Sequence, residues 1–290
     1  MSTTVNTIPR AFLWRRLHSL MGLWFVLFLM EHLLTNSQAA LWLGDNGKGF
    51  VRMVDFLHNL PFLQVIEIVL LGVPILIHMV WGVKYLFTSR SNSFPTNGSK
   101  PSLTKYGRNH AYTWQRITSW ILLFGVILHV AKFRFLEYPE SIKEGAVTTY
   151  YIKVSSDDGL RPVADRLGVT LYDSHDIKFQ EKLNSLKGIK NKPLKQDEFL
   201  AASKDFGTAT LMAVRDTFKS PLYVGLYTIF VLAACFHAFN GCWTFLITWG
   251  IVLKYTAQKM TVHICTAVML ILMFLGLMAV WGTYWLNLKQ

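Results

Sequence analysis

Residues 12–40, FLWRRLHSLMGLWFVLFLMEHLLTNSQAA, constrain the fold more than any other stretch of this chain. Two arginines precede about 20 mostly apolar residues, a run long enough to cross a hydrocarbon core about 30 Å thick. The stretch therefore predicts a transmembrane helix. Its far end carries His32, and an ionisable side chain at such a depth is costly. His32 is by default a candidate functional residue.

The composition agrees with a membrane protein. Of the 290 residues, 52% are hydrophobic, and they fall in long apolar blocks. The net charge of +12 does not require a nucleic acid, and we expect none as a partner, because Lys and Arg beside membrane spans set their orientation. All three cysteines lie in apolar blocks, so we expect no disulfide framework.

Five apolar segments predict an all-α membrane protein with five transmembrane helices, at about 12–35, 62–87, 113–135, 221–251 and 261–286. Pro74 should kink the second helix, and Pro221 suits the start of the fourth. The chain is thereby divided into 1–135, which holds the first three helices, an insertion at 136–220, and 221–290, which holds the last two.

The insertion at 136–220 contains 13 basic and 13 acidic residues, with apolar residues recurring throughout. We expect a small extramembrane subdomain with a strand at 150–154 and a helix at 208–218. No catalytic motif occurs in it.

Basic residues orient the chain, because Lys and Arg accumulate on the cytoplasmic side of membrane spans. The N-terminus, the second connection and the fourth connection carry most of those near the spans: Arg10, Arg15, Arg16, Lys84, Arg90, Lys100, Lys105, Arg108, Arg116, Lys254 and Lys259. The first connection and the C-terminus carry only Lys48, Arg52 and Lys289. We therefore expect a cytoplasmic N-terminus, with the C-terminus and the insertion outside.

Each of the first four predicted helices carries a histidine deep inside its apolar run: His32, His78, His129 and His237. A single intramembrane histidine could equally be a packed polar residue or a ligand. Four, one per helix, are hard to explain by packing alone, given the cost of ionisable groups in lipid. Bundle cores hold cofactors between facing helices, so we expect the first four helices to form a cofactor-binding bundle.

Depth along the helices suggests how these histidines pair. His32 and His129 lie about 20–24 Å beyond their basic anchors, at about 1.5 Å per residue, which places both toward the outer face. His78 is close to Lys84 and so lies nearer the inner face, and His237 pairs with it by elimination. Two bis-histidine sites are therefore expected, one above the other across the membrane.

Two imidazoles without thiolate or carboxylate companions suit a low-spin electron-transfer haem. Zinc or copper sites usually need three or four clustered ligands. No C-x-x-C-H attachment motif occurs, so two b-type haems are expected. Gly82 and Gly241 would leave room for a flat macrocycle, although glycine also serves helix packing. The candidate contacts for the haem propionates at the inner end are Arg15, Arg16, His18, Ser19, Gln115 and Arg116. The alternative role for the arginines is to anchor the topology alone.

In these residues the chain resembles the cytochrome b subunit of succinate dehydrogenases, in the five-helix, two-haem form of Bacillus-type succinate:menaquinone reductases and related fumarate reductases. The resemblance rests on RRLHSLMG…EHLLTNSQAA, LPFLQVIEIV, HMVWGVKYLFT, WQRIT…LHV and FHAFNGCWTFLITWGI. It implies iron ligands at His32, His78, His129 and His237, and His18 and Ser19 near a propionate. The insertion at 136–220 is much longer than the connection typical of the family.

The resemblance also implies a function. Such a subunit anchors the flavoprotein and iron–sulfur subunits at the cytoplasmic face of a bacterial membrane, and the succinate site lies on those partners. It passes electrons from the iron–sulfur subunit through two b haems to a membrane quinone, here menaquinone. A quinol:fumarate reductase, running in the opposite direction, is the alternative within this class.

Quinone reduction consumes protons, so acidic groups near the outer end are candidates for quinone or proton contact. Glu31 and Glu67 are the acidic residues within the predicted helices, and Asp55 and His58 border the same face. The alternative for Glu67 is a hydrogen bond within the bundle. Two other readings of the whole chain are a transporter with a histidine pathway and a purely structural anchor.

Overall fold

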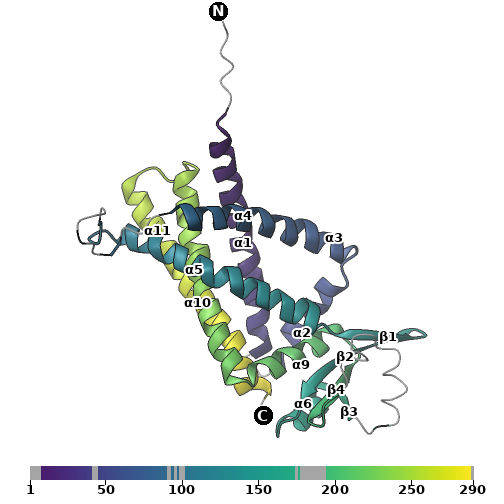
Figure 1. Cartoon of the computed structure of the whole chain (residues 1–290). Helices are drawn as coiled ribbons and strands as arrows, with labels where there is room; N and C mark the ends of the chain where they lie inside the picture. Colours follow the sequence, from purple (N-terminus) through teal and green to yellow (C-terminus); the bar gives the residue numbers. More distant parts are fainter. Residues whose placement is uncertain are drawn as a thin grey trace, which may run out of the picture. The chain divides into compact units, whose positions relative to one another are not determined.

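The computed structural model describes residues 8–40, 45–89, 93–94, 97, 102–173, 176 and 194–288. Arg90, Lys100 and Lys289, three of the basic residues counted above, lie outside these ranges. Helices dominate the described chain, and one sheet interrupts the helical series (Figure 1). The helices are α1 (Arg10–Ser37), η1 (Gln38–Ala40), α2 (Lys48–His58), α3 (Leu63–Glu67), η2 (Ile68–Gly72), α4 (Val73–Thr88), α5 (Gly107–Val130), η3 (Ala131–Leu136), α6 (Leu160–Leu167), α9 (Phe206–Phe218), α10 (Pro221–Thr248), α11 (Tyr255–Leu277) and η4 (Met278–Leu288).

Five helical stretches within the described residues are long and apolar enough to cross a membrane: Arg10–Ala40, Leu63–Thr88, Gly107–Leu136, Pro221–Thr248 and Tyr255–Trp285. They coincide with the five predicted spans, and the fourth begins at Pro221 as expected. The predicted class, an all-helical membrane protein with five spans, is confirmed.

Pro74 disturbs the second span through a π-helical turn, η2, directly before it. Proline lacks the N–H that would bond the carbonyl four residues earlier, and its ring pushes against that carbonyl. The carbonyl concerned is that of Leu70, and it accepts a hydrogen bond from the indole Nε1 of Trp24 at 2.6 Å. A side chain of α1 thus satisfies the backbone group that Pro74 leaves open.

The chain divides into two compact units. The first unit consists of Met1–Glu31, Gln64–Gly125 and Leu232–Met273. The second unit consists of His32–Leu63, Val126–Val231 and Phe274–Gln290. Helices α1, α5, α10 and α11 contribute residues to both units. The predicted division of the chain at residues 135 and 220 separated the membrane helices from an insertion outside the membrane, and it stays a prediction.

The second unit contains a four-stranded antiparallel sheet in the order β1-β2-β4-β3. Its strands are β1 (Glu140–Glu144), β2 (Val147–Ser155), β3 (Thr170–Tyr172) and β4 (Glu198–Ser203). The strand predicted at 150–154 lies within β2, where aromatic and β-branched residues favour extended backbone. The other three strands were not predicted.

Helix α9 is the central helix of this unit, and all its residues except Thr210 and Asp216 are buried. It packs against β2, β4, α2 and η4, and these neighbours together bury the helix on nearly every side. Asp205 caps its start by accepting the N–H of Thr208 at 2.7 Å. At Gly207 a Cβ would come within 2.5 Å of the carbonyl oxygen of Val51, so only glycine permits this approach to α2. The predicted helix at 208–218 is confirmed.

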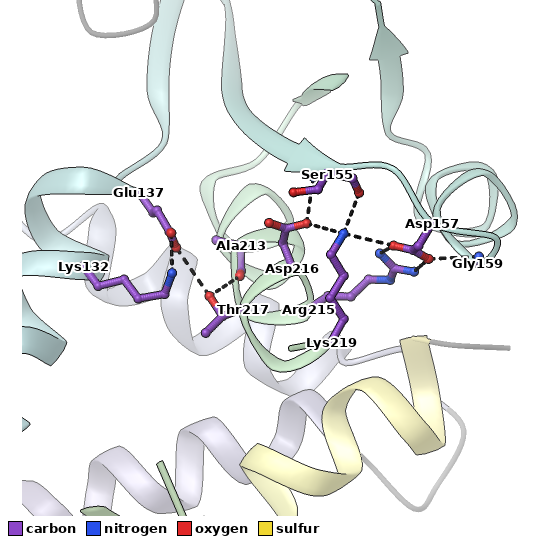
Figure 2. A network of polar contacts seen from close by, with 10 residues as sticks. All are labelled: Lys132, Glu137, Ser155, Asp157, Gly159, Ala213, Arg215, Asp216, Thr217 and Lys219. Atoms are coloured by element: carbon purple, nitrogen blue, oxygen red, sulfur yellow. Dashed lines mark hydrogen bonds and ion pairs between the residues drawn. The ribbon is translucent and has the colours of Figure 1, made fainter. Parts of the chain in front are cut away.

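A network of charged side chains joins α9 to the end of β2 (Figure 2). Arg215 is fully buried and donates to both carboxylate oxygens of Asp157, at 2.8 and 2.5 Å. Lys219 also reaches Asp157, at 3.2 Å, and donates to the carbonyl of Ser155 at 2.6 Å. Desolvation opposes ionisation of Asp157, but the hydrogen bonds and charges of Arg215 and Lys219 outweigh it and hold its pKa below the ordinary value. The carboxylate is thus a structural counter-ion.

We predict that Asp157→Asn lowers the free energy of unfolding by about 3 kcal/mol at neutral pH, because it leaves the buried Arg215 without its carboxylate. The depressed pKa of Asp157 means that this contribution is present at neutral pH and is lost only as the pH falls through the folded pKa, below the ordinary value of 3.8. Unfolding of the purified protein in mixed detergent micelles measures the change. Asp158→Asn, at the exposed neighbouring position, is the control and should change little. Equal effects of the two variants would contradict this account.

Candidate functional site

The structure brings the four intramembrane histidines together in two pairs. His78 on α4 and His237 on α10 lie in the first unit, with ring centroids 6.2 Å apart and ring planes at 82°. His32 on α1 and His129 on α5 lie in the second unit, with centroids 5.9 Å apart and planes at 87°. These are the pairs expected from depth. Their role as iron ligands stays a prediction.

The hydrogen bond of His78 fixes which ring nitrogen carries its proton. Nδ1 of His78 lies 3.0 Å from the carbonyl oxygen of His18. A carbonyl can only accept, so Nδ1 must carry the hydrogen and donate it. Nε2 then keeps its lone pair, and this is the tautomer that a histidine ligand of a metal requires.

His237 is contacted at Nδ1 by two hydroxyl groups. Its Nδ1 lies 3.4 Å from both Thr118 Oγ1 and Ser119 Oγ. Thr118 also donates to the carbonyl of Trp114 at 2.8 Å, and Ser119 donates to that of Gln115 at 2.7 Å. At 3.4 Å the two contacts with Nδ1 are long, so they orient the His237 ring without fixing its tautomer.

The second pair is oriented by different groups. Nδ1 of His129 lies 3.2 Å from the hydroxyl of Tyr227. Nδ1 of His32 is 3.4 Å from the amide nitrogen of Asn36, which also donates to the backbone carbonyl of His32 at 2.7 Å. A phenol can donate or accept, and the Asn36 contact is long. These contacts orient both rings without fixing their tautomers.

The donor set matches one kind of metal chemistry. Within the described ranges, no three His, Cys, Asp or Glu side chains are grouped as a metal site. Paired imidazoles, with the lone pair of His78 on Nε2, suit bis-histidine ligation of haem iron.

His18 lies beside the first pair and has a buried polar atom in need of a partner. Its ring stacks on that of His78, with centroids 4.1 Å apart and planes within 8°. Its Nδ1 is buried and has no hydrogen-bond partner among the described residues. Such a group is costly to bury unsatisfied. A carboxylate of a bound cofactor would satisfy it, which fits the predicted place of a propionate.

Two other predicted propionate contacts have partners within the protein. Arg16 donates to the carbonyl of Thr248 and stacks on the ring of Trp249, 5.1 Å from its centroid. Ser19 donates to the carbonyl of Arg16 at 2.9 Å and accepts from Trp249 Nε1, also at 2.9 Å. Both side chains therefore join α1 to the end of α10.

The remaining predicted contacts also have neighbours within the protein. Arg116 stacks on Tyr112, with the guanidinium carbon 3.8 Å from the ring centroid. Arg15 lines a pocket between α1 and α4. Gln115 donates to the backbone carbonyl of His237 at 3.1 Å, so it helps to position that histidine's helix.

The candidate acidic groups are placed differently from one another. Glu31 is exposed on α1, next to His32, and Glu67 is partly exposed at the end of α3, directly before the π-helical turn. Their quinone or proton role stays a prediction.

Asp55 and His58 join α2 to α9. Asp55 accepts the N–H of Gly207 at 2.7 Å. Burial raises the pKa of Asp55, although that hydrogen bond works in the opposite direction. His58 stacks on Phe206 with centroids 3.8 Å apart, and its Nδ1 lies 3.5 Å from the hydroxyl of Tyr138. Both residues thus have a structural task that the sequence did not reveal.

Sequence reasoning missed the residues that hold the histidines. Thr118, Ser119 and Tyr227 are hydroxyl residues inside apolar helices, where such groups must find partners, and this pattern could have drawn attention to them. It also did not single out Gly22. A Cβ at Gly82 or Gly241 would make ordinary contacts of 3.8 and 3.7 Å, whereas one at Gly22 would lie 3.0 Å from His78 Cε1.

A comparison with curated proteins identifies a relative along nearly the whole chain. The sequence is 26% identical over 274 residues to the "Succinate dehydrogenase cytochrome b558 subunit" of Bacillus subtilis (strain 168), covering 94% of this chain and 97% of the relative. No family model and no solved structure matches the chain. The relative confirms the resemblance that the quoted stretches indicated.

We predict that Gly22→Ala is destabilising, because the added methyl presses on the ring of His78, which its hydrogen bond to His18 holds in place. Overpacking of this kind costs about 1–3 kcal/mol. Gly225→Ala is a matched control in α10, because a Cβ there meets nothing within 4 Å, and it should stabilise the helix slightly. Thermal unfolding in detergent compares the two. A stabilising effect at both positions would show that the His78 ring is free to move.

Proposed function

We propose that this protein is the cytochrome b membrane-anchor subunit of a succinate dehydrogenase. The observation that carries the proposal is the arrangement of four intramembrane histidines as two ring pairs, each ring contacted at Nδ1 by a neighbouring polar group. The name of the Bacillus subtilis relative supports the same assignment, and the similarity extends over nearly the full length of the chain.

In this proposal His78 and His237 hold one b-type haem, and His32 and His129 hold a second. When bound, the haems supply one-electron transfer between a partner iron–sulfur subunit and a membrane quinone, for which we propose menaquinone. The protein's part is to fix the imidazoles. The carbonyl of His18 orients His78, and the hydroxyls of Thr118 and Ser119 orient His237.

His18 would donate to a haem propionate through its buried Nδ1, and Arg16, Ser19 and Arg116 would extend that polar end of the site. Of these, His18 has the strongest support, because its Nδ1 has no other hydrogen-bond partner in the described chain. Arg16 and Ser19 already bond within the protein, which favours an indirect role for them.

We further propose the orientation that the basic residues favour, with the N-terminus in the cytoplasm and residues 136–220 and the C-terminus outside. The basic cytoplasmic face would attract the flavoprotein and iron–sulfur subunits, on which succinate is oxidised. The name of the relative favours succinate oxidation over fumarate reduction as the working direction.

For proton supply to the quinone we propose Glu67. It lies in the helix of His78 and is partly exposed beside the irregular π-helical turn. Glu31 is a second candidate because it adjoins His32. Asp55 and His58 are less suited to direct quinone contact, since their side chains pack against the start of α9.

We predict that His78→Ala and His129→Ala each lower the haem content from two per chain toward one, because each removes one ligand from a different pair. A pyridine haemochrome count with a reduced-minus-oxidised spectrum measures this. His263→Ala is the control, since His263 is exposed on α11 outside both pairs. Well-folded wild-type protein without haem would overturn the proposed function.

We predict that Glu67→Gln depresses quinone reduction at least tenfold and leaves both haem spectra intact, because the amide keeps the shape and loses the proton. Gln64→Ala, at an exposed position on the same short helix, should have little effect. Turnover with a soluble menaquinone analogue in the assembled complex provides the measurement. Full activity of Glu67→Gln would remove Glu67 from the proposal.

A further inference from the structure

A pocket with a volume of about 440 Å³ opens between the start of α1 and the end of α4, within the first unit. Its lining residues are partly basic and partly aromatic. We call Arg10, Arg15 and Lys84 the basic rim, and Trp14, Trp81 and Tyr85 the aromatic wall. None of the histidine pairs lines it.

The charged residues that line this pocket are all basic. No carboxylate is among its lining residues, and none of its three cations has an ion pair within the described part of the chain. Glu31 is the one acidic residue of α1, and it lies 16 positions after Arg15, or about 24 Å along a helix. Helix α4 has none. Three cations around one pocket repel one another, so the site is complementary to an anion.

The wall of the pocket gives it an amphipathic character. The rings of Trp14 and Trp81 lie against each other with centroids 5.1 Å apart, and Lys84 Nζ lies 4.4 Å from the centroid of Trp81. Tryptophan and tyrosine gather where a membrane's hydrocarbon meets its headgroups. The basic rim and the aromatic wall therefore match the two sides of that boundary.

The choice of occupant follows from the aromatic residues beside the cations. An acidic segment of a protein partner would use the cations but would have no need of the aromatic rings, whereas the apolar part of a lipid can pack on them.

We propose that this pocket binds an anionic phospholipid, with its phosphate among Arg10, Arg15 and Lys84 and its glycerol and acyl chains against Trp14 and Trp81. Basic pockets between transmembrane helices are suited to such headgroups. The inference goes beyond the proposed function, because it depends on the chain lying in a membrane and not on haem or quinone.

The test titrates purified protein in neutral detergent with dioleoyl phosphatidylglycerol and with dioleoyl phosphatidylcholine, and follows the midpoint of thermal unfolding. The double variant Arg10→Gln/Lys84→Gln removes two of the three cations. The matched control is Lys105→Gln/Lys254→Gln, which removes two exposed cations expected on the same side of the membrane but outside the pocket. Size-exclusion profiles report whether each variant is folded.

We expect phosphatidylglycerol to stabilise the wild type more than phosphatidylcholine does. The pocket variant should bind phosphatidylglycerol about 25-fold more weakly, at roughly fivefold per cation, and the control variant should bind like the wild type. Equal weakening in both variants, or no preference for phosphatidylglycerol, would overturn the proposal. If excess inorganic phosphate displaced the lipid, the pocket would be a general anion site and not a lipid site. If the complex with the soluble subunits no longer bound the lipid, the pocket would instead belong to the interface with a protein partner.

Discussion

Polar groups inside a membrane must find their partners within the protein, because hydrocarbon supplies none. This constraint explains the contacts of the first unit. The carbonyl that Pro74 leaves open accepts from Trp24, and Nδ1 of His78 donates to the carbonyl of His18. Satisfying Nδ1 has a second effect, since it leaves the lone pair of Nε2 on the other side of the ring. The bond that satisfies Nδ1 of His78 is the one that would leave Nε2 available for the proposed iron.

The sequence was sufficient for the features that depend on one-dimensional patterns. Span length and apolar density located all five membrane helices. Depth counting along straight helices placed His32 and His129 at one level and His78 at another, and elimination assigned His237 to His78, which are the ring pairs found in the structure. These predictions needed no knowledge of which helix faces which.

The features that it did not reveal depend on contacts between distant segments. Strand β4 pairs with β2 across roughly 50 residues, and its sequence EFLAAS has no strong strand pattern of its own. Helix α2 lies in a connection that was expected only to link two spans, and Asp55 fastens it to Gly207 far along the chain. Thr118 and Ser119 are ordinary helix residues until His237 is placed beside them.

The contact between Trp24 and the carbonyl of Leu70 has a consequence for how this sequence can change over time. The need for a donor at position 24 exists only while position 74 is a proline, since any other residue would supply its own N–H to that carbonyl. If Trp24 were replaced first, the carbonyl of Leu70 would have no hydrogen-bond donor in the hydrocarbon. If Pro74 were replaced first, the new residue would supply that donor. Substitutions at positions 24 and 74 should therefore co-vary among relatives, although the residues lie on different helices. We expect the proline to be replaced before the tryptophan.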